Sequence, residues 1–244
     1  GSPPAMPSAG LGSGRGGAPV AQTAAGTQAI APASRIPGGI PNDQEEIMAL
    51  TDRVKRILLT PKAEWPVIDA EQTSVASLYT GYIIPLAAIG PIASILGWTV
   101  FGLQVPFAGS YRLPIGFAVR SAAIQYVGAL VGVFVLGLII DGLAPTFGGQ
   151  KNQIQALKVA AYSATAAWVV GILGLIPALG FLGLLGLYSL YLLLLGLPIL
   201  MKAPEDKAIG YTLVVIVVAI VLAVAVSALT ARFMWHPAMS LPGT

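Results

Sequence analysis

The chain of 244 residues has no cysteine and a single histidine, His236. Without cysteine it can form no disulfide, no thiolate metal site and no cysteine nucleophile. One histidine also argues against a multi-histidine metal site and against a histidine-aspartate relay. These absences exclude several common kinds of catalytic centre.

Charged residues are scarce as well. Lys, Arg, Asp and Glu make up 9% of the chain, against about a quarter in a soluble globular protein. Hydrophobic residues make up 56%, and the mean hydropathy is +0.81. Because so few charges cannot cover a surface that faces water, the composition predicts an integral membrane protein.

The sequence motifs of common enzymes are also missing. The chain contains no Gly-x-Ser-x-Gly, no Walker A and no His-Glu-x-x-His sequence. Its isoelectric point near 9.2 comes from a few bases beside apolar stretches, which indicates membrane topology rather than nucleic-acid binding. We therefore predict a protein that is not an enzyme, with no cofactor and no metal, in contact with membrane lipid.

Residues 1–42 differ in composition from the rest of the chain. They contain nine Gly, seven Pro and nine Ala, and their only charges are Arg15 and Arg35. Such a segment buries too little apolar surface to offset the entropy of ordering, so we expect a disordered tail. The segment lacks the basic start and following apolar run of a secretory signal, so we do not expect it to be one. A second short tail is expected over residues 233–244.

The first ordered element is predicted over residues 43–59. Acidic residues lead and basic residues follow, as the helix dipole favours. Asn42 and Glu45 suit a capping arrangement at its start, and Thr60 before Pro61 marks its end. Apolar residues at three- and four-residue spacing form one stripe on this helix, namely Ile47, Leu50, Val54, Ile57 and Leu58.

Together with the next few residues, this helix forms a predicted interfacial segment over residues 43–66. We expect it to lie on the membrane surface beside the spans, with Trp65 in the headgroup layer. The alternative is a docking helix for a cytoplasmic protein partner.

Five apolar stretches follow, each near the roughly 20 residues that a helix needs to cross a membrane. The first contains Pro85 and Pro91, and Pro177 joins the third directly to the fourth. The predicted fold over residues 67–232 is therefore all-α, a membrane bundle of five transmembrane helices. The expected spans are 78–101, 117–143, 156–176, 179–200 and 209–231.

Basic residues orient this bundle through the positive-inside rule. Eight of them fall on the side of the interfacial segment and three on the other side. We therefore expect a protein of the inner membrane of the cell, with the N-terminus in the cytoplasm and the C-terminus outside. A re-entrant first span would place the N-terminus on the opposite side. The eight are Arg53, Lys55, Arg56, Lys62, Lys151, Lys158, Lys202 and Lys207, and the three are Arg112, Arg120 and Arg232.

Ionisable residues inside a membrane are the first place to look for a site. The only acid within the expected spans is Asp141, at the opposite end of its span from Arg120. We expect Asp141 to be structural, capping the helix end or pairing with Lys151 or Lys158, and Lys158 to reach the interface by snorkelling. The spans contain no row of carboxylates that would indicate a proton relay.

Several short stretches occur in a particular order along the chain: Leu-Leu-Thr-Pro-Lys-Ala-Glu-Trp at 58–65, Leu-Tyr-Thr-Gly-Tyr at 78–82, Asp-Gly-Leu-Ala-Pro at 141–145 and Tyr-Ser-Leu-Tyr at 188–191. Together they resemble bacterial members of the Yip1 family of multi-pass membrane proteins. The resemblance covers about residues 50–232 and implies five spans with a cytoplasmic N-terminus. Eukaryotic relatives bind small Rab GTPases, but here Ser77 replaces the acid of their hallmark and Thr80 precedes Gly81. The resemblance therefore predicts a fold rather than an activity.

The candidate functional or structural residues come from these motifs and from the charged positions of the spans. They are Tyr79, Gly81, Tyr82, Pro85, Arg120, Asp141, Pro145, Gly148, Gly149, Lys158, Tyr162 and Tyr188.

Two classes of function remain open. A scaffold or adaptor that recruits a partner or shapes the membrane fits the amphipathic helix and the lack of buried charge. A transporter or channel for a small solute or lipid fits the proline-containing first span, because broken helices often line substrate sites; an enzyme acting on lipid headgroups is a distant third. Small residues such as Gly128 and Gly132 also suit a homo-oligomer. A packed bundle would favour the scaffold and an open cavity at mid-membrane the transporter.

Overall fold

The computed structural model describes residues 43–105 and 109–234, together with Gly1. The tail expected over 2–42, the cap expected at Asn42 with the Glu45 side chain, and residues 235–244 lie outside the described part.

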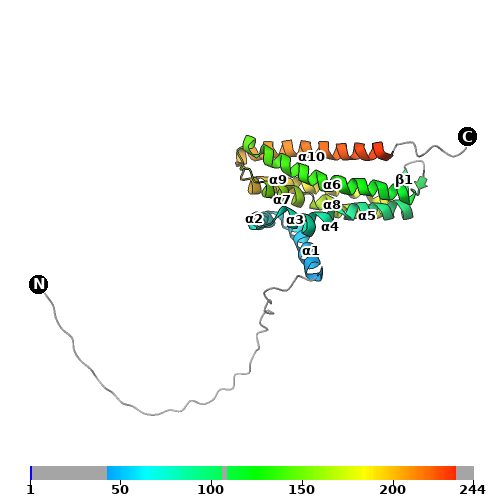
Figure 1. The fold of residues 1–244 in the computed structure, drawn as a ribbon, viewed down its shortest axis with the longest axis horizontal. Helices are drawn as coiled ribbons and strands as arrows, with labels where there is room; N and C mark the ends of the chain where they lie inside the picture. The colour runs from blue at the N-terminus through cyan, green and yellow to red at the C-terminus, as the bar shows by residue number, and fades with distance from the viewer. Residues whose placement is uncertain (2–42, 106–108, 235–244) are drawn as a thin grey trace, which may run out of the picture. The chain divides into compact units, whose positions relative to one another are not determined.

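Five helical segments of the described chain are long and apolar enough to cross a membrane, which confirms the predicted all-α bundle (Figure 1). Each begins and ends within a few residues of its expected bounds. A helix rises about 1.5 Å per residue, so even the shortest, of 23 residues, extends about 35 Å. The segments are Val75–Phe101, Ile115–Phe147, Gln153–Leu175, Pro177–Met201 and Glu205–Arg232.

The first span is one continuous run of helical turns of two kinds. Pro85 has no N–H group to close an α-helical turn, and the preceding turn is widened into a π-helix in which Ile84 N donates to Tyr79 O. The predicted break at this proline is thus a change of helix type. In order, the pieces are α3 (Val75–Leu78), η1 (Tyr79–Ile83), α4 (Ile84–Ala87), α5 (Ile89–Leu96) and η2 (Gly97–Phe101).

A small β-hairpin connects the first span to the second. Strand β1 (Leu103–Val105) pairs antiparallel with β2 (Gly109–Tyr111), with Leu103 opposite Tyr111. The second span then consists of α6 (Ile115–Leu143) and a short 3-10 turn, η3 (Ala144–Phe147).

The third and fourth spans are irregular where glycine is frequent, because glycine stabilises an α-helix poorly. The third comprises α7 (Gln153–Ser163), α8 (Thr165–Val170) and η4 (Gly171–Leu175). The fourth comprises η5 (Pro177–Leu187), a 3-10 helix, and α9 (Tyr188–Met201). The glycines also allow close backbone contact, since a Cβ atom on Gly171 would lie 2.8 Å from the Cα atom of Gly90 in α5.

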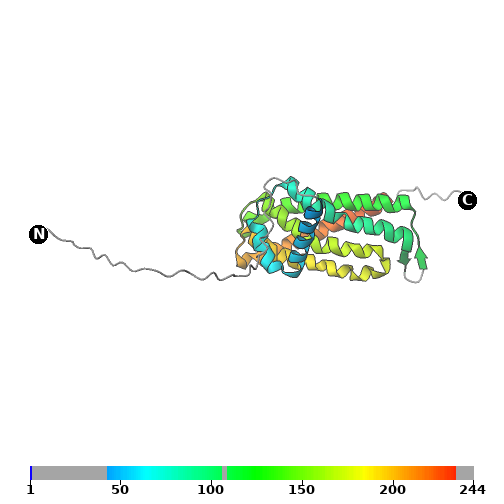
Figure 2. The same cartoon turned by 90° about the horizontal axis from the view of Figure 1, so that it is seen from below.

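The fifth span, within α10 (Glu205–Met234), lies along α6 at the side of the bundle, as Figures 1 and 2 show. Only 11% of its most apolar window is buried, against 56% for the third span. The third span therefore forms the centre of the bundle, and most of α10 presents apolar side chains for lipid.

Candidate functional site

Helix α1 (Asp43–Leu59) has the predicted bounds. It projects from the bundle at a steep angle to the spans (Figure 1). Helix α2 (Pro61–Ala70) starts directly after Thr60, with Pro61 in the first turn, where its missing N–H costs nothing. The segment predicted over 43–66 is therefore two helices, and the second continues four residues further. We call α1 and α2 together the platform.

The apolar stripe of α1 packs mainly on protein. Ile57 is completely buried, and Leu50, Val54 and Leu58 pack against the same core, whereas Ile47 at the outer end is 59% exposed. Tyr188 Oη, from α9, donates to Leu58 O at 3.0 Å and so satisfies a carbonyl near the end of α1. The half of α1 next to α2 is thus fixed on the bundle, whereas residues 47–49 towards its outer end are exposed.

Trp65 faces the interior of the protein and not the lipid headgroups, so the prediction made for its side chain is wrong. Its side chain in α2 is completely buried and lies against Gly196 of α9. Its ring meets the ring of Tyr162 edge to face, with the centroids 6.4 Å apart. Gly196 has no side chain, so the indole can approach the backbone of α9 and anchor α2 to the fourth span.

Charged side chains join α1 to α2. Glu64 is only 3% exposed; its carboxylate accepts from Arg53 at 2.6 Å and from Arg56 Nε at 3.1 Å. Arg53 also pairs with Glu71. Burial by itself would lower the pKa of Arg53, but the hydrogen bond to Glu71 and the surrounding negative charge outweigh it and raise that pKa. Neither arginine could be removed without leaving the Glu64 carboxylate short of a partner.

Basic and amide side chains from the spans hold the end of α2. Lys158 Nζ donates to Ile68 O at 2.8 Å and to Glu71 O at 2.6 Å, and its side chain is almost fully buried. The prediction that Lys158 snorkels to the interface is therefore wrong. Gln155 Nε2 donates to Asp69 O at 2.9 Å, and Lys202 pairs with the Asp69 carboxylate. Cations at these carbonyls also match the negative end of the helix dipole.

Two of the predicted tyrosines lie beneath the platform. The rings of Tyr82 and Tyr162 are 4.4 Å apart, and the Tyr82 hydroxyl shares a hydrogen bond of 2.7 Å with Thr165 Oγ1. The Arg53 guanidinium lies 6.0 Å from the centre of the Tyr162 ring, at the limit of a cation-π contact. These contacts link α1, the first span and the third span.

A groove of about 580 Å³ separates α1 from the start of the first span. We call it the platform groove. One wall is the apolar side of α1, with Ile47, Ala49 and Leu50; the other carries hydroxyl groups from Thr73, Ser77 and Thr80. The predicted residues Gly81, Tyr82, Pro85 and Tyr162 also line it. The groove thus brings together residues that the sequence analysis had singled out separately.

The end of the second span and the turn after it contain three more of the predicted residues. Gly148 has a φ of +75°, which glycine adopts readily. Gly149 lies so close to α9 that a Cβ atom there would be 2.8 Å from Met201 O, and Gln150 N donates to the same oxygen at 2.8 Å. Pro145 starts the short helix η3 and is exposed. The turn therefore docks on the end of α9.

Asp141 does not form the pair that was predicted for it. Among the described residues no ion pair joins it to Lys151 or Lys158, and its Oδ1 atom is buried without a hydrogen-bond partner. Its neighbourhood is aromatic: the rings of Phe147 and Tyr211 are stacked 4.9 Å apart, and Tyr211 Oη donates to Ile140 O. The segment that follows Asp141 joins α10 to α6.

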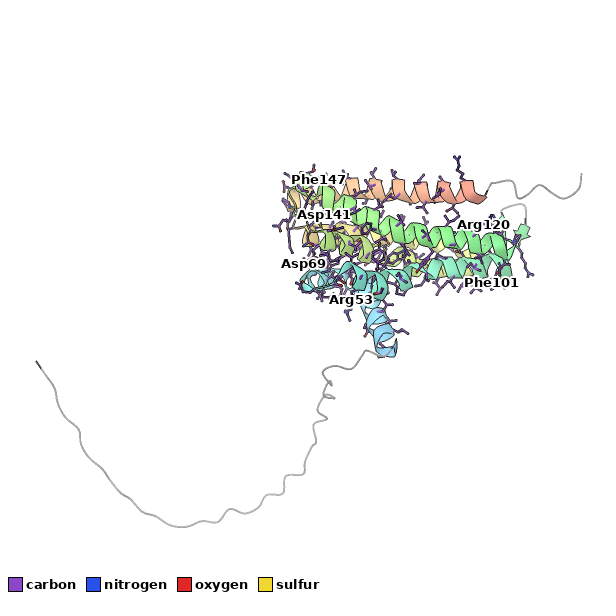
Figure 3. All side chains as sticks on the ribbon, viewed as in Figure 1. Arg53, Asp69, Phe101, Arg120, Asp141 and Phe147 are labelled. Carbon is purple, nitrogen blue, oxygen red and sulfur yellow. The ribbon has the colours of Figure 1, made fainter. Side chains whose placement is uncertain are left out.

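The two remaining predicted residues lie apart from the platform groove. Tyr79 Oη donates to Leu130 O of α6 at 2.9 Å, which ties the first span to the second. Arg120 is exposed on α6, far from Asp141, as Figure 3 shows. The sequence analysis had missed Glu64 as the centre of the platform, although its position a few residues after Arg53 and Arg56, across Pro61, is a signal of such a pairing.

No group of three or more acidic or histidine side chains in the described ranges could hold a metal ion.

Comparison with known proteins identifies one family. The family model described as "Yip1 domain" matches residues 55–226, most of the chain and all five spans in large part. The chain has no significant match among the curated proteins or the solved structures.

Proposed function

This chain belongs to the Yip1 domain family, and we propose that it is a non-enzymatic membrane scaffold that recruits a cytoplasmic protein through its platform. The observation that carries this proposal is the contrast within α1. Its base is fixed by the Glu64 ion pairs and by Ile57, while its outer half borders an open groove. A fixed platform beside an open groove is an arrangement for holding a partner, since little ordering entropy is lost on binding.

The lining of the platform groove favours a protein segment with apolar and hydrogen-bonding side chains. It offers aliphatic side chains from α1 opposite the hydroxyls of Thr73, Ser77 and Thr80. Arg53 is already paired with Glu64 and Glu71, so this lining residue offers no free charge to a ligand. Figure 1 shows that α1 runs at a steep angle to the spans. In the proposed arrangement, α1 extends along the cytoplasmic surface of the membrane, where a partner can reach it.

Photo-crosslinking from the groove tests this function, and the natural absence of cysteine makes single-cysteine variants simple. With a benzophenone attached at Thr80→Cys, we expect one defined protein adduct in native membranes, and none from Leu213→Cys on the exposed side of α10. Adding Gly81→Leu should remove the adduct, because Gly81 lines the groove and has open space for a side chain.

The matched control is Gly142→Leu, which also adds a side chain in open space but lies outside the groove. It should leave the adduct unchanged. Adducts with lipid alone, insensitive to Gly81→Leu, would replace protein recruitment by a role at the bilayer surface.

We also propose that the platform is cytoplasmic and that the membrane is the inner membrane of the cell. The eight basic residues near the platform end of the spans support this orientation. In intact cells, a membrane-impermeant maleimide should label Arg112→Cys, at the hairpin end, and should label Lys62→Cys only after the cells are opened. Both positions are exposed, so accessibility within the protein does not differ. The reverse labelling pattern would contradict the orientation.

A further inference from the structure

The third span is interrupted near the middle of its own length. Helix α7 ends at Ser163 and α8 starts at Thr165, within a span of 23 residues. In the first turn of α8, Ala167 N donates to Ser189 Oγ of the fourth span at 3.0 Å. Irregular backbone at membrane depth is tolerated where protein surrounds it or where it lines a cavity.

Two crevices meet at this interruption. One, of about 580 Å³, lies between α6, the third and fourth spans and α10; the other, of about 540 Å³, lies between the first four spans. Gln125, Ala129, Ala167 and Trp168 line both. Each has a volume within the range of small-molecule sites, about 300–1,000 Å³. Among the described residues, no charged side chain lines either crevice.

One polar atom at this junction has no partner. Ser163 is 5% exposed and lines the larger crevice, and its Oγ atom is buried without a hydrogen bond. A hydroxyl without a partner is unfavourable in an apolar environment, where no water can replace it. Gln125 lines the same crevice and uses one amide hydrogen, which it donates to Ser121 Oγ at 3.0 Å. The site therefore offers hydrogen-bond donors within an otherwise apolar crevice.

We propose that this junction binds an uncharged, membrane-soluble molecule that carries a carbonyl oxygen on an apolar chain. A carbonyl oxygen can accept from the Ser163 hydroxyl and from the second amide hydrogen of Gln125. The apolar chain fits the lining of small and aliphatic side chains, and the lack of charged residues excludes an ionic headgroup from the crevice. The indole of Trp168 provides a flat surface between the two crevices. This ligand site is independent of the platform groove.

Quenching of tryptophan fluorescence by decylubiquinone tests the proposal on the full chain in detergent. Trp168 lines both crevices and Trp98 one of them, so a bound quinone would quench them. We expect saturable quenching, which n-decylbenzene, with the same chain but no carbonyl, does not displace at equal concentration. Ser163→Ala should weaken binding about three- to tenfold, as the loss of one hydrogen bond does. Ser227→Ala, an exposed hydroxyl on the edge of the same crevice, should not.

A second pair of variants tests the place of the site. Ala129→Phe puts a ring where the two crevices meet and should abolish saturable quenching, whereas Ala123→Phe, on an exposed side of α6, should leave it intact. Should Ala129→Phe fail to fold, Ser163→Ala still decides, since it removes a single oxygen atom. Equal displacement by n-decylbenzene, or quenching unchanged by Ser163→Ala, would mean that acyl chains fill the crevice without specificity and would overturn the proposal.

Discussion

Trp65→Ala is expected to lower the free energy of unfolding in detergent by about 3–5 kcal/mol, the usual cost of removing a large buried aromatic side chain. Trp65 is completely buried between α2 and α9 and also contacts Tyr162. Its loss leaves a cavity that the backbone of Gly196 cannot fill. Equilibrium unfolding, followed by the fluorescence of the other tryptophans and by circular dichroism, measures the change.

Leu59→Ala is the control for this variant, because Leu59 is an apolar residue of the same platform but is 78% exposed. Its effect should lie within about 0.5 kcal/mol, as for most surface substitutions. If Trp65→Ala were equally mild, Trp65 would have to lie in the headgroup layer, and the packing of α2 on α9 would be wrong.

The same contact can be tested from its other side. A Cβ atom at Gly196 would lie 2.6 Å from Trp65 Cε2, so Gly196→Ala forces the ring or the helix to move and should cost about 1–3 kcal/mol. Gly183→Ala, in the same span, adds a methyl group where no atom lies within 4 Å and should have almost no effect. Equal stability of the two variants would show that Trp65 does not rest on Gly196.

Glu64→Ala is expected to cost about 3 kcal/mol and to release α1 from the bundle. Removing one partner of a buried ion pair typically costs about 3–5 kcal/mol, because the remaining charge stays buried. The lower end applies here, since Arg56 is 48% exposed and Arg53 keeps Glu71 as a partner. Limited proteolysis should then cleave near Thr60 at a higher rate, and thermal unfolding should shift to a lower temperature.

Two controls separate the charge of Glu64 from its shape and from surface charge in general. Glu64→Gln keeps the size of the side chain and one hydrogen-bond acceptor, so its effect should be smaller than that of alanine. Asp52→Ala removes an acid that is 60% exposed and 4.0 Å from Lys55, an exposed pair worth at most about 1 kcal/mol. Proteolysis near Thr60 at the same rate in Glu64→Ala and Asp52→Ala would show that the buried pairs do not hold the platform.

The Glu64→Ala variant also bears on the proposed function. If the fixed base of α1 is needed to present the platform groove, Glu64→Ala should weaken the crosslinked adduct from Thr80→Cys, although Glu64 does not line the groove. An unchanged adduct would place the partner on the first span alone.

The sequence by itself determined the features that depend on local patterns. Apolar runs of spanning length gave the five spans, and the three- and four-residue spacing with Thr60 and Pro61 gave the bounds of α1. These predictions succeeded because helix formation depends on neighbours along the chain, and because lipid imposes a minimum apolar length. The family was also predicted from the sequence, because the order of its short motifs can be read without knowing any contact between residues.

Only the tertiary structure decided what each polar or aromatic residue does. Trp65 and Lys158 have side chains that suit the membrane interface, yet one packs on Gly196 and the other binds the end of α2. Asp141 lacks the lysine partner that its position suggested, and Ser163 lies unpaired at a helix interruption. These outcomes depend on contacts between residues far apart in the chain, such as Lys158 and Ile68, which are 90 positions apart. A sequence pattern shows which groups need partners, but packing of the spans selects the partners, because only residues brought within bonding distance can satisfy a buried polar group.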